Sequence, residues 1–444
     1  MSNNYSKIRF IGFAIPTTPA QVVGIGDING AGMVAGTYLG DADTQTDITK
    51  RIAIMKHAVD TAKSALPTGE TDVVNVFVAP EFYFHGLEGP YVYAEQEDDP
   101  IDFMQQSLST AFNATDYSNW TFICGSVITA LVKNIDVVYN SNSATTRNAV
   151  VQNLAEQWQA SFGPLQDVIL DMLVNFIKNC HSYPNCEIRD RSVIVSNIPI
   201  RTPQVDDPTN LMATEKYYVS NEDLLLYDVT GKNIVTEQMS AYPVLDLSGG
   251  DAKQSAFDPY AIFRQNDINP SNPIGTTVTD YGVEICLDHS DVRLRRNIDN
   301  EPSVIGGIHV QLIPSCGMQI HLPSVATDEN GFVFNCDGEY VLNDQNSGQS
   351  VISNVDCLYA NYTDSSNSQY QAHSQLARVD VGAVGGDPNA PGSSNATLQT
   401  LDAADITVIP VPDKNGLSIN DFYAGGPGQI HIYGLSSGYT LYPE

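Results

Sequence analysis

Basic residues are scarce in this chain, where 21 lysines and arginines stand against 52 aspartates and glutamates over 444 residues. The formal net charge is −31. A surface with this excess of negative charge repels nucleic acids and anionic membranes, because both carry charge of the same sign. We therefore expect neither a nucleic-acid partner nor a membrane partner. The charge balance favours solubility and carries no information about the fold.

Long apolar runs are also missing, since no stretch approaches the roughly 20 apolar residues of a membrane-spanning helix. The opening residues, Met1 to Lys7, lack the apolar core of a secretory signal. The cysteines are odd in number and form no dense framework, which favours reduced thiols in an intracellular protein. We expect a cytoplasmic protein whose seven cysteines are mostly free: Cys124, Cys180, Cys186, Cys286, Cys316, Cys336 and Cys357.

Strand-like and helix-like segments alternate in the first part of the chain. An apolar content of 42% and a charged content of 16% are typical of a globular protein and not of a disordered one. Apolar runs predict strands at 8–15, 73–78 and 120–127, while apolar residues at helical spacing predict helices at 47–66 and from Pro100 onward. This alternation predicts an α/β fold.

No convincing domain linker is present, so we predict one enlarged domain over residues 1–444. Residues 153–190, with a helical pattern, and residues 232–276, rich in Pro, Gly, Ser and Asn, are predicted as insertions. Residues 24–46 are rich in Gly and Asp and predict a loop. Residues 385–444 are predicted as a β-rich C-terminal extension.

The rest of the chain is organised around the stretch Tyr281–His289, in which a short apolar strand pattern runs directly into Cys286. A thiol at the end of a buried strand is held rigidly at a sheet edge, where a sharp turn can expose its sulfur. Two other stretches make chemical sense beside it. One carries Glu81 after a strand and before three aromatic residues, and the other carries Lys216 before two tyrosines.

With Glu81, Lys216 and Cys286 in this order, the chain resembles the carbon–nitrogen hydrolase (nitrilase) superfamily, whose catalytic residues are a glutamate, a lysine and a cysteine. Pro80-Glu81-Phe82 and residues 284–288 match the family's glutamate and cysteine motifs. The lysine motif differs, and the family's frequent arginine four places after the cysteine is Ser290 here. The 135 residues from Glu81 to Lys216 and the 70 from Lys216 to Cys286 are wider intervals than usual, consistent with the two insertions.

The resemblance implies a four-layer α-β-β-α sandwich with insertions, and a site that needs no metal and no cofactor. It also implies that Cys286 attacks the substrate carbon and that Glu81 moves the protons. Lys216 and the backbone N–H of Leu287 would hold the oxyanion. Glu222 lies at a distance suited to the family's second glutamate, which would orient Lys216.

We predict an amidase that hydrolyses a non-peptide C–N bond, releases ammonia and passes through a thioester acyl-enzyme. The expected partner is a small-molecule amide or nitrile, and the expected assembly is a homo-oligomer. Phe82, Tyr83 and His289 are predicted to contact the substrate. A nitrilase or an N-carbamoyl hydrolase of the same superfamily stays open, as does acyl transfer to a nucleophile other than water. A non-catalytic scaffold or binding protein on this fold is the alternative from another class.

Each candidate residue also has a structural interpretation. Cys286 alone would suit a buried core thiol, Glu81 a strand-end acid and Lys216 a solvated surface lysine, so the combination favours catalysis more than any one residue does. His289 follows Cys286 closely enough for a thiol-protease pair, but the favoured interpretation is that it lines the pocket or packs nearby. The group formed by Cys180, His181 and Cys186 matches no standard zinc spacing.

Overall fold

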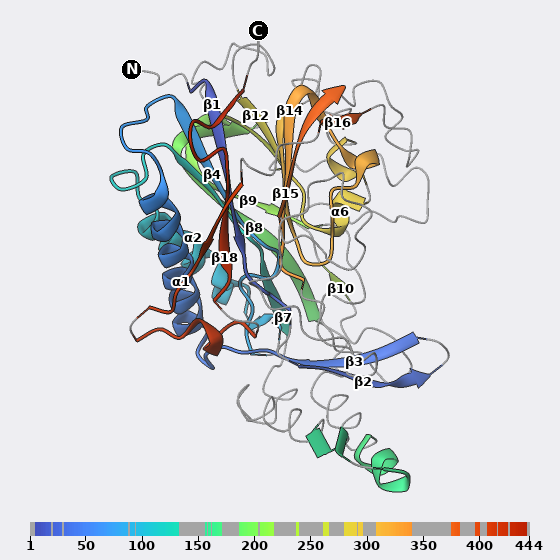
Figure 1. Cartoon of the computed structure of the whole chain (residues 1–444). Helices are drawn as coiled ribbons and strands as arrows, with labels where there is room; N and C mark the ends of the chain where they lie inside the picture. The colour runs from blue at the N-terminus through green and yellow to red at the C-terminus, as the bar shows by residue number, and fades with distance from the viewer. Residues whose placement is uncertain are drawn as a thin grey trace.

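The protein is mixed α/β, with a large curled sheet, a separate two-stranded ribbon and few helices among the residues described (Figure 1). None of the helices in the described part of the chain is long and apolar enough to cross a lipid bilayer. The computed structural model of the chain describes residues 5–18, 21–28, 31–87, 89–93, 95–132, 156–157, 159–160, 162–170, 186–202, 205–216, 237–238, 261–265, 279–290, 292–295, 308–339, 374–381, 396–399, 406–414, 416–424 and 427–441.

Strands dominate the described part of the chain. The helices are α1 (Thr44–Ala65), α2 (Pro100–Ala111) and the short α6 (Leu287–Ser290), with 3-10 turns at Gln96–Asp98, Leu322–Ser324 and Ile419–Asp421. The strands are β1 (Lys7–Ala14), β2 (Gln21–Ile28), β3 (Ala31–Thr37), β4 (Val73–Ala79), β5 (Tyr91–Tyr93), β6 (Trp120–Cys124), β7 (Val127–Val132), β8 (Cys186–Thr202), β9 (Val205–Glu215), β10 (Glu237–Gln238), β11 (Ile262–Gln265), β12 (Thr279–Val283), β13 (Ile308–Ser315), β14 (Thr327–Asp337), β15 (Ser374–Val381), β16 (Thr397–Gln399), β17 (Ile406–Pro410), β18 (Gln429–Tyr433) and β19 (Tyr439–Thr440).

The sheet has two halves joined through the long strand β8. In the first half, β1 lies between β18 and β4, β4 pairs in parallel with β6, and β6 pairs with β8 in antiparallel fashion. The C-terminal end of β8 pairs with β11, from which β12, β13, β14 and β15 follow in order. Strands β12, β13 and β14 are parallel to one another.

The two halves pack face to face. The ring of Phe10 on β1 lies with its centroid 5.4 Å from that of Phe332 and 5.3 Å from that of Phe334, both on β14. Alternate residues of β4, such as Val74 and Val76, are buried in the same cluster. A core between two sheet faces follows from the period of two along each strand, because every second side chain points to the same face.

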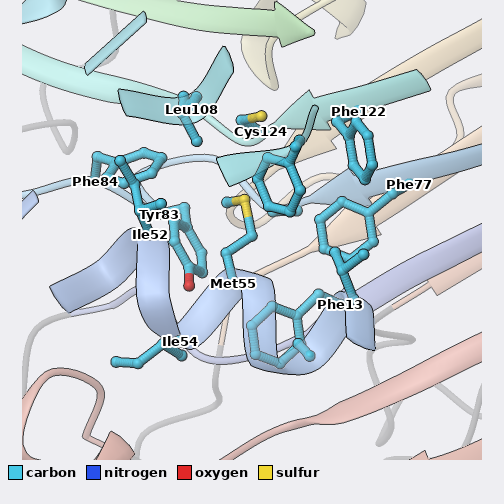
Figure 2. Packing of buried hydrophobic residues seen from close by; sticks show 14 of the residues in the cluster. Phe13, Ile52, Ile54, Met55, Phe77, Tyr83, Phe84, Leu108, Phe122 and Cys124 are labelled. Carbon is cyan, nitrogen blue, oxygen red and sulfur yellow. The ribbon is translucent and has the colours of Figure 1, made fainter. Parts of the chain in front are cut away.

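Helices α1 and α2 cover the opposite face of the first half. Ile52 and Met55 of α1 are buried with Phe77 of β4 and Phe122 of β6, as Figure 2 shows. The predicted helix is confirmed, but it begins at Thr44, earlier than its predicted start at Asp47. The reason is that the Asp43 side chain caps the helix by accepting from the backbone N–H of Thr46 at 2.8 Å.

Several strands lie where the sequence pattern predicted loops or insertions. The loop predicted at 24–46 is wrong, because β2 and β3 form an antiparallel ribbon there, and the Asn-Gly pair between them is typical of a hairpin turn. Residues 186–190 belong to β8 and residues 262–265 to β11, inside the two predicted insertions. In the C-terminal segment, β18 pairs directly with β1 and is therefore part of the main sheet.

Candidate functional site

The ends of β4, β12 and β13 meet at one place, and this brings Glu81 next to Cys286. The backbone N–H of Cys286 donates to the carbonyl of Pro314 at 3.0 Å, and that of Glu81 donates to the carbonyl of Ser315 at 3.2 Å. Two consecutive carbonyls at the end of β13 thus hold the two candidate residues. Glu81 follows β4 and Cys286 follows β12, so each lies just beyond the C-terminal end of a parallel strand, where α/β sheets place their functional residues.

Lys216 joins this group through a fully buried ion pair. Its ammonium Nζ lies 2.7 Å from Oε1 of Glu81, and neither side chain is exposed. Lys216 directly follows β9, and its backbone N–H donates to the carbonyl of Asp190 at 2.8 Å. The ammonium also lies 5.5 Å from the centroid of the Phe82 ring, within the range of a cation–π contact. An ion pair removed from water in this way is strongly coupled, so each partner fixes the other's position.

The backbone of the site is strained at Cys286 and at the residue that follows Glu81. Cys286 has φ +46°, and Phe82, which follows Glu81, has φ +56°. A residue other than glycine in the left-handed region costs about 1–3 kcal/mol and persists only where the surroundings enforce it. The Cys286 residue is 5% exposed, and its Sγ donates a weak hydrogen bond to the carbonyl of Cys316 at 3.7 Å. Such strain is concentrated at functional sites, where it aims a side chain.

The strained backbone gives a test that needs no substrate. We expect the free energy of unfolding of Cys286→Gly to exceed that of Cys286→Ala by about 0.5–1 kcal/mol. The reason is that glycine adopts φ +46° without the Cβ clash that alanine keeps. Urea unfolding of the two variants measures the difference. Equal stability, or a more stable alanine variant, would contradict the strained conformation.

Arg293 ties the turn of Cys286 to the strand that carries Lys216. Its guanidinium Nη1 donates to the carbonyl of Glu215 at 2.6 Å and also bonds the carboxylate of Asp288. Glu215 immediately precedes Lys216, and Asp288 lies two residues after Cys286. One buried arginine therefore sets the spacing between the ammonium and the thiol. The sequence shows a run of arginines here, Arg293, Arg295 and Arg296, but no residue pattern specifies the partners of Arg293.

His289 belongs to a buried hydrogen-bond network beneath the turn that carries Cys286. Its Nε2 accepts from the backbone N–H of His321 at 2.9 Å, so the ring proton resides on Nδ1, which donates to Glu284 at 2.7 Å. Gln311 also donates to Glu284 at 2.7 Å. Both ring nitrogens of His289 are thus engaged within the protein. This placement supports neither the prediction that His289 contacts substrate nor a Cys–His protease pair.

The other predicted site residues fall into different surroundings. Tyr83 is fully buried in the helix-side core (Figure 2), where its hydroxyl donates to the carbonyl of Arg51 at 3.0 Å. This position gives no support to the prediction that Tyr83 contacts the substrate. Phe82 is partly exposed beside Lys216. The backbone N–H of Leu287, also partly exposed, has no hydrogen-bond acceptor among the described residues, and Glu222 lies outside them.

Cys316 is a second thiol at the site that sequence reasoning did not single out. Burial raises the pKa of its thiol well above the usual value, and the negative charges of Asp337 and Glu81 raise it further. Asp337 also accepts from the backbone N–H groups of Gly317 and Met318, at 2.8 and 2.9 Å, and so shapes the turn that carries Cys316. Cys316 is therefore held as a neutral thiol and is unsuited to act as the nucleophile.

Gly125, at the end of β6, is required by the close approach of the Glu81 turn. A Cβ added there would lie 2.3 Å from the carbonyl oxygen of Pro80, and Gly125 has φ +70°. Gly69 has a similar φ of +83° but open space around it. We expect Gly69→Ala to cost about 1 kcal/mol, and Gly125→Ala to cost about 1–3 kcal/mol more, because backbone atoms must move. Denaturant unfolding measures both; equal losses would show that the contact with Pro80 is unimportant.

Comparison of the chain with protein-family models, with curated proteins and with solved structures gives no match. Within the described residues, no group of three or more His, Cys, Asp or Glu side chains is arranged to hold a metal ion. Cys180 and His181 lie outside those residues, and Cys186 begins β8. A functional proposal therefore rests on the geometry around Glu81, Lys216 and Cys286.

Proposed function

We propose that the protein is a cysteine-dependent hydrolase of a non-peptide C–N bond, and in the first place an amidase. The observation that carries the proposal is the buried Glu81–Lys216 ion pair, which the ends of β4 and β9 place beside the strained turn of Cys286. A carboxylate, an ammonium and a thiol supply a proton carrier, a positive charge and a nucleophile, which are the groups that acyl transfer from an amide requires.

In the proposed reaction, the Cys286 sulfur attacks the amide carbonyl carbon and its proton passes to Glu81. The S–C bond that forms places negative charge on the carbonyl oxygen, which Lys216 and the N–H of Leu287 stabilise. The C–N bond then breaks, Glu81 delivers its proton to the nitrogen, and ammonia departs. The acyl group remains bound to the Cys286 sulfur as a thioester. Glu81 next takes a proton from water, which attacks the thioester. The C–S bond breaks, the thiol regains its proton and the carboxylic acid departs.

We further propose that the fold is a four-layer α-β-β-α sandwich. The support for this proposal is that the two sheet halves pack against each other and that α1 and α2 cover the outer face of the first half. The outer face of the second half carries α6 and the turn Leu322–Ser324 among the described residues. Helices covering the rest of that face would complete the fourth layer. A homo-oligomer and a small-molecule substrate are part of the same proposal.

The proposal is tested by an ammonia-release screen over small amides, nitriles and N-carbamoyl compounds. We expect release from at least one amide by the wild-type protein, and none from the same preparation of Cys286→Ala, which controls for contaminating amidases. Activity on nitriles or carbamoyl compounds alone would replace the amidase with one of those alternatives. Added hydroxylamine should divert part of the product to a hydroxamate, because it competes with water for the thioester. Equal release by the two proteins would refute the proposal.

A further inference from the structure

Most of the basic side chains at the candidate site are engaged by a carboxylate. Four of them belong to the strands and turns that hold Glu81, Lys216 and Cys286. Each faces an acidic partner within 4.0 Å: Lys216 with Glu81 at 2.7 Å, Arg191 with Asp99 at 2.8 Å, Arg189 with Glu215 at 3.8 Å, and Arg293 with Asp288. A carboxylate on a substrate would therefore have to compete with a protein carboxylate for each of these cations.

Carboxylates outnumber cations in the same part of the structure. Besides the four paired acids, Glu284 lies under the cysteine turn, Asp337 shapes the turn of Cys316, and the carboxylate of Glu339 lies beside Gly317 in that turn. With Arg295, whose Nη1 donates to the carbonyl of Pro323, five cations stand against seven carboxylates, which gives a formal balance of −2. The formal charge of the whole chain is −31.

We propose that the site selects amides that carry a positive charge and discriminates against amides that carry a carboxylate. The inference rests on the proposed amidase function and names its substrate class. A negative field concentrates cationic ligands near a site and raises their association rate, while it slows anionic ones, and salt screens both effects. The scissile amide is uncharged in all cases, so the discrimination acts on the part of the substrate remote from the reacting carbon.

Three amides of similar length test the charge preference: 4-aminobutyramide, a cation; butyramide, which is neutral; and succinamate, an anion. We expect kcat/KM for ammonia release to fall in that order, with at least about a tenfold ratio between cation and anion at low ionic strength. Sodium chloride at about 0.5 M should reduce the ratio several-fold, because the Debye length shortens. A preference for succinamate, or an order that salt leaves unchanged, would overturn the proposal.

A pair of matched variants tests whether the charges at the site are responsible. Asp99→Asn leaves Arg191 without its acidic partner but keeps the side-chain oxygen that accepts from the N–H of Ile101 at the start of α2. Asp380→Asn makes the same change in total charge at an exposed position of β15, six residues from the strand end that pairs with Cys336. We expect the cation-to-anion ratio to fall at least about threefold in Asp99→Asn and to stay unchanged in Asp380→Asn. Equal ratios in the two variants would contradict a local origin.

Binding to the Cys286→Ala protein separates failure of this inference from failure of the proposed function. Isothermal titration calorimetry with the same three amides measures affinity without turnover. If wild type releases no ammonia but the inactive variant binds the cation more tightly than the anion, the charge preference holds and the amidase proposal fails. If wild type hydrolyses succinamate and 4-aminobutyramide with equal kcat/KM, the charge preference fails and the amidase proposal stands. If the protein neither hydrolyses nor binds any of the three amides, both proposals are overturned.

Discussion

Lys216→Met alone should destabilise the protein by about 3–5 kcal/mol, because it leaves the carboxylate of Glu81 buried without its cation. The Glu81–Lys216 pair is fully inaccessible to solvent, and its charged atoms are 2.7 Å apart. Adding Glu81→Gln to Lys216→Met removes the uncompensated charge. We therefore expect the double variant to be more stable than Lys216→Met, even though it carries one substitution more.

Denaturant unfolding of the two single variants and the double variant measures this coupling. The control is Lys56→Met, which breaks the ion pair with Asp60 on the surface of α1, where the two side chains are 37% and 43% exposed. A surface pair of this kind contributes about 1 kcal/mol or less. If Lys216→Met costs no more than Lys56→Met, the burial of the Glu81–Lys216 pair is not what holds the site together.

The parts of the fold that the sequence predicted are those in which local pattern and tertiary packing agree. Ile48, Ile52, Met55 and Val59 recur at helical spacing, and all four are buried on the face of α1 that meets the sheet. The near-continuous apolar run in β4 is covered by helices on one face and by the second sheet half on the other. In such elements the hydrophobic period alone identifies both the structure and the buried face.

The parts that escaped prediction depend on partners distant in sequence. Strand β11 has four residues, Ile262 to Gln265, inside a polar segment, and it is defined by pairing with β8 and β12. Strand β18 pairs with β1 across the length of the chain, and no local pattern specifies this neighbour. Short strands are stabilised by cross-strand contacts more than by their own composition, so a single sequence leaves them ambiguous.

The candidate site also has features that the sequence predicts and features that depend on residues distant in sequence. Glu81, Lys216 and Cys286 were identified from residue types at the ends of strand-like runs, and the structure brings their backbones to one edge. The roles of His289 and Arg293 were not accessible from sequence, since both follow from hydrogen bonds to residues in other segments. The sequence shows that His289 lies close to the candidate nucleophile, but it does not show that both ring nitrogens have hydrogen-bond partners within the protein.

Cys286 should react with iodoacetamide at least about tenfold faster than Cys124, Cys316 or Cys336, because it lies in the strained turn that Arg293 ties to the Lys216 strand. Burial raises the pKa of the thiols of Cys124, Cys316 and Cys336, so these three carry little thiolate at pH 8. Peptide mapping after brief alkylation measures the order. An amide that the protein hydrolyses should slow the labelling of Cys286 alone.

Loss of the same thiol should have the largest effect of any substitution on turnover. We expect Cys286→Ala to reduce kcat for amide hydrolysis by about 10⁴-fold or more, since no other group can form the thioester. Cys124→Ala is the matched control, because Cys124 is a buried cysteine of the helix-side core and its loss leaves the reacting groups in place. Activity in Cys286→Ala above about 1% of wild type, or equal labelling of Cys286 and Cys124, would mean that the sulfur of Cys286 is a structural thiol and that the Glu81–Lys216 ion pair has another purpose.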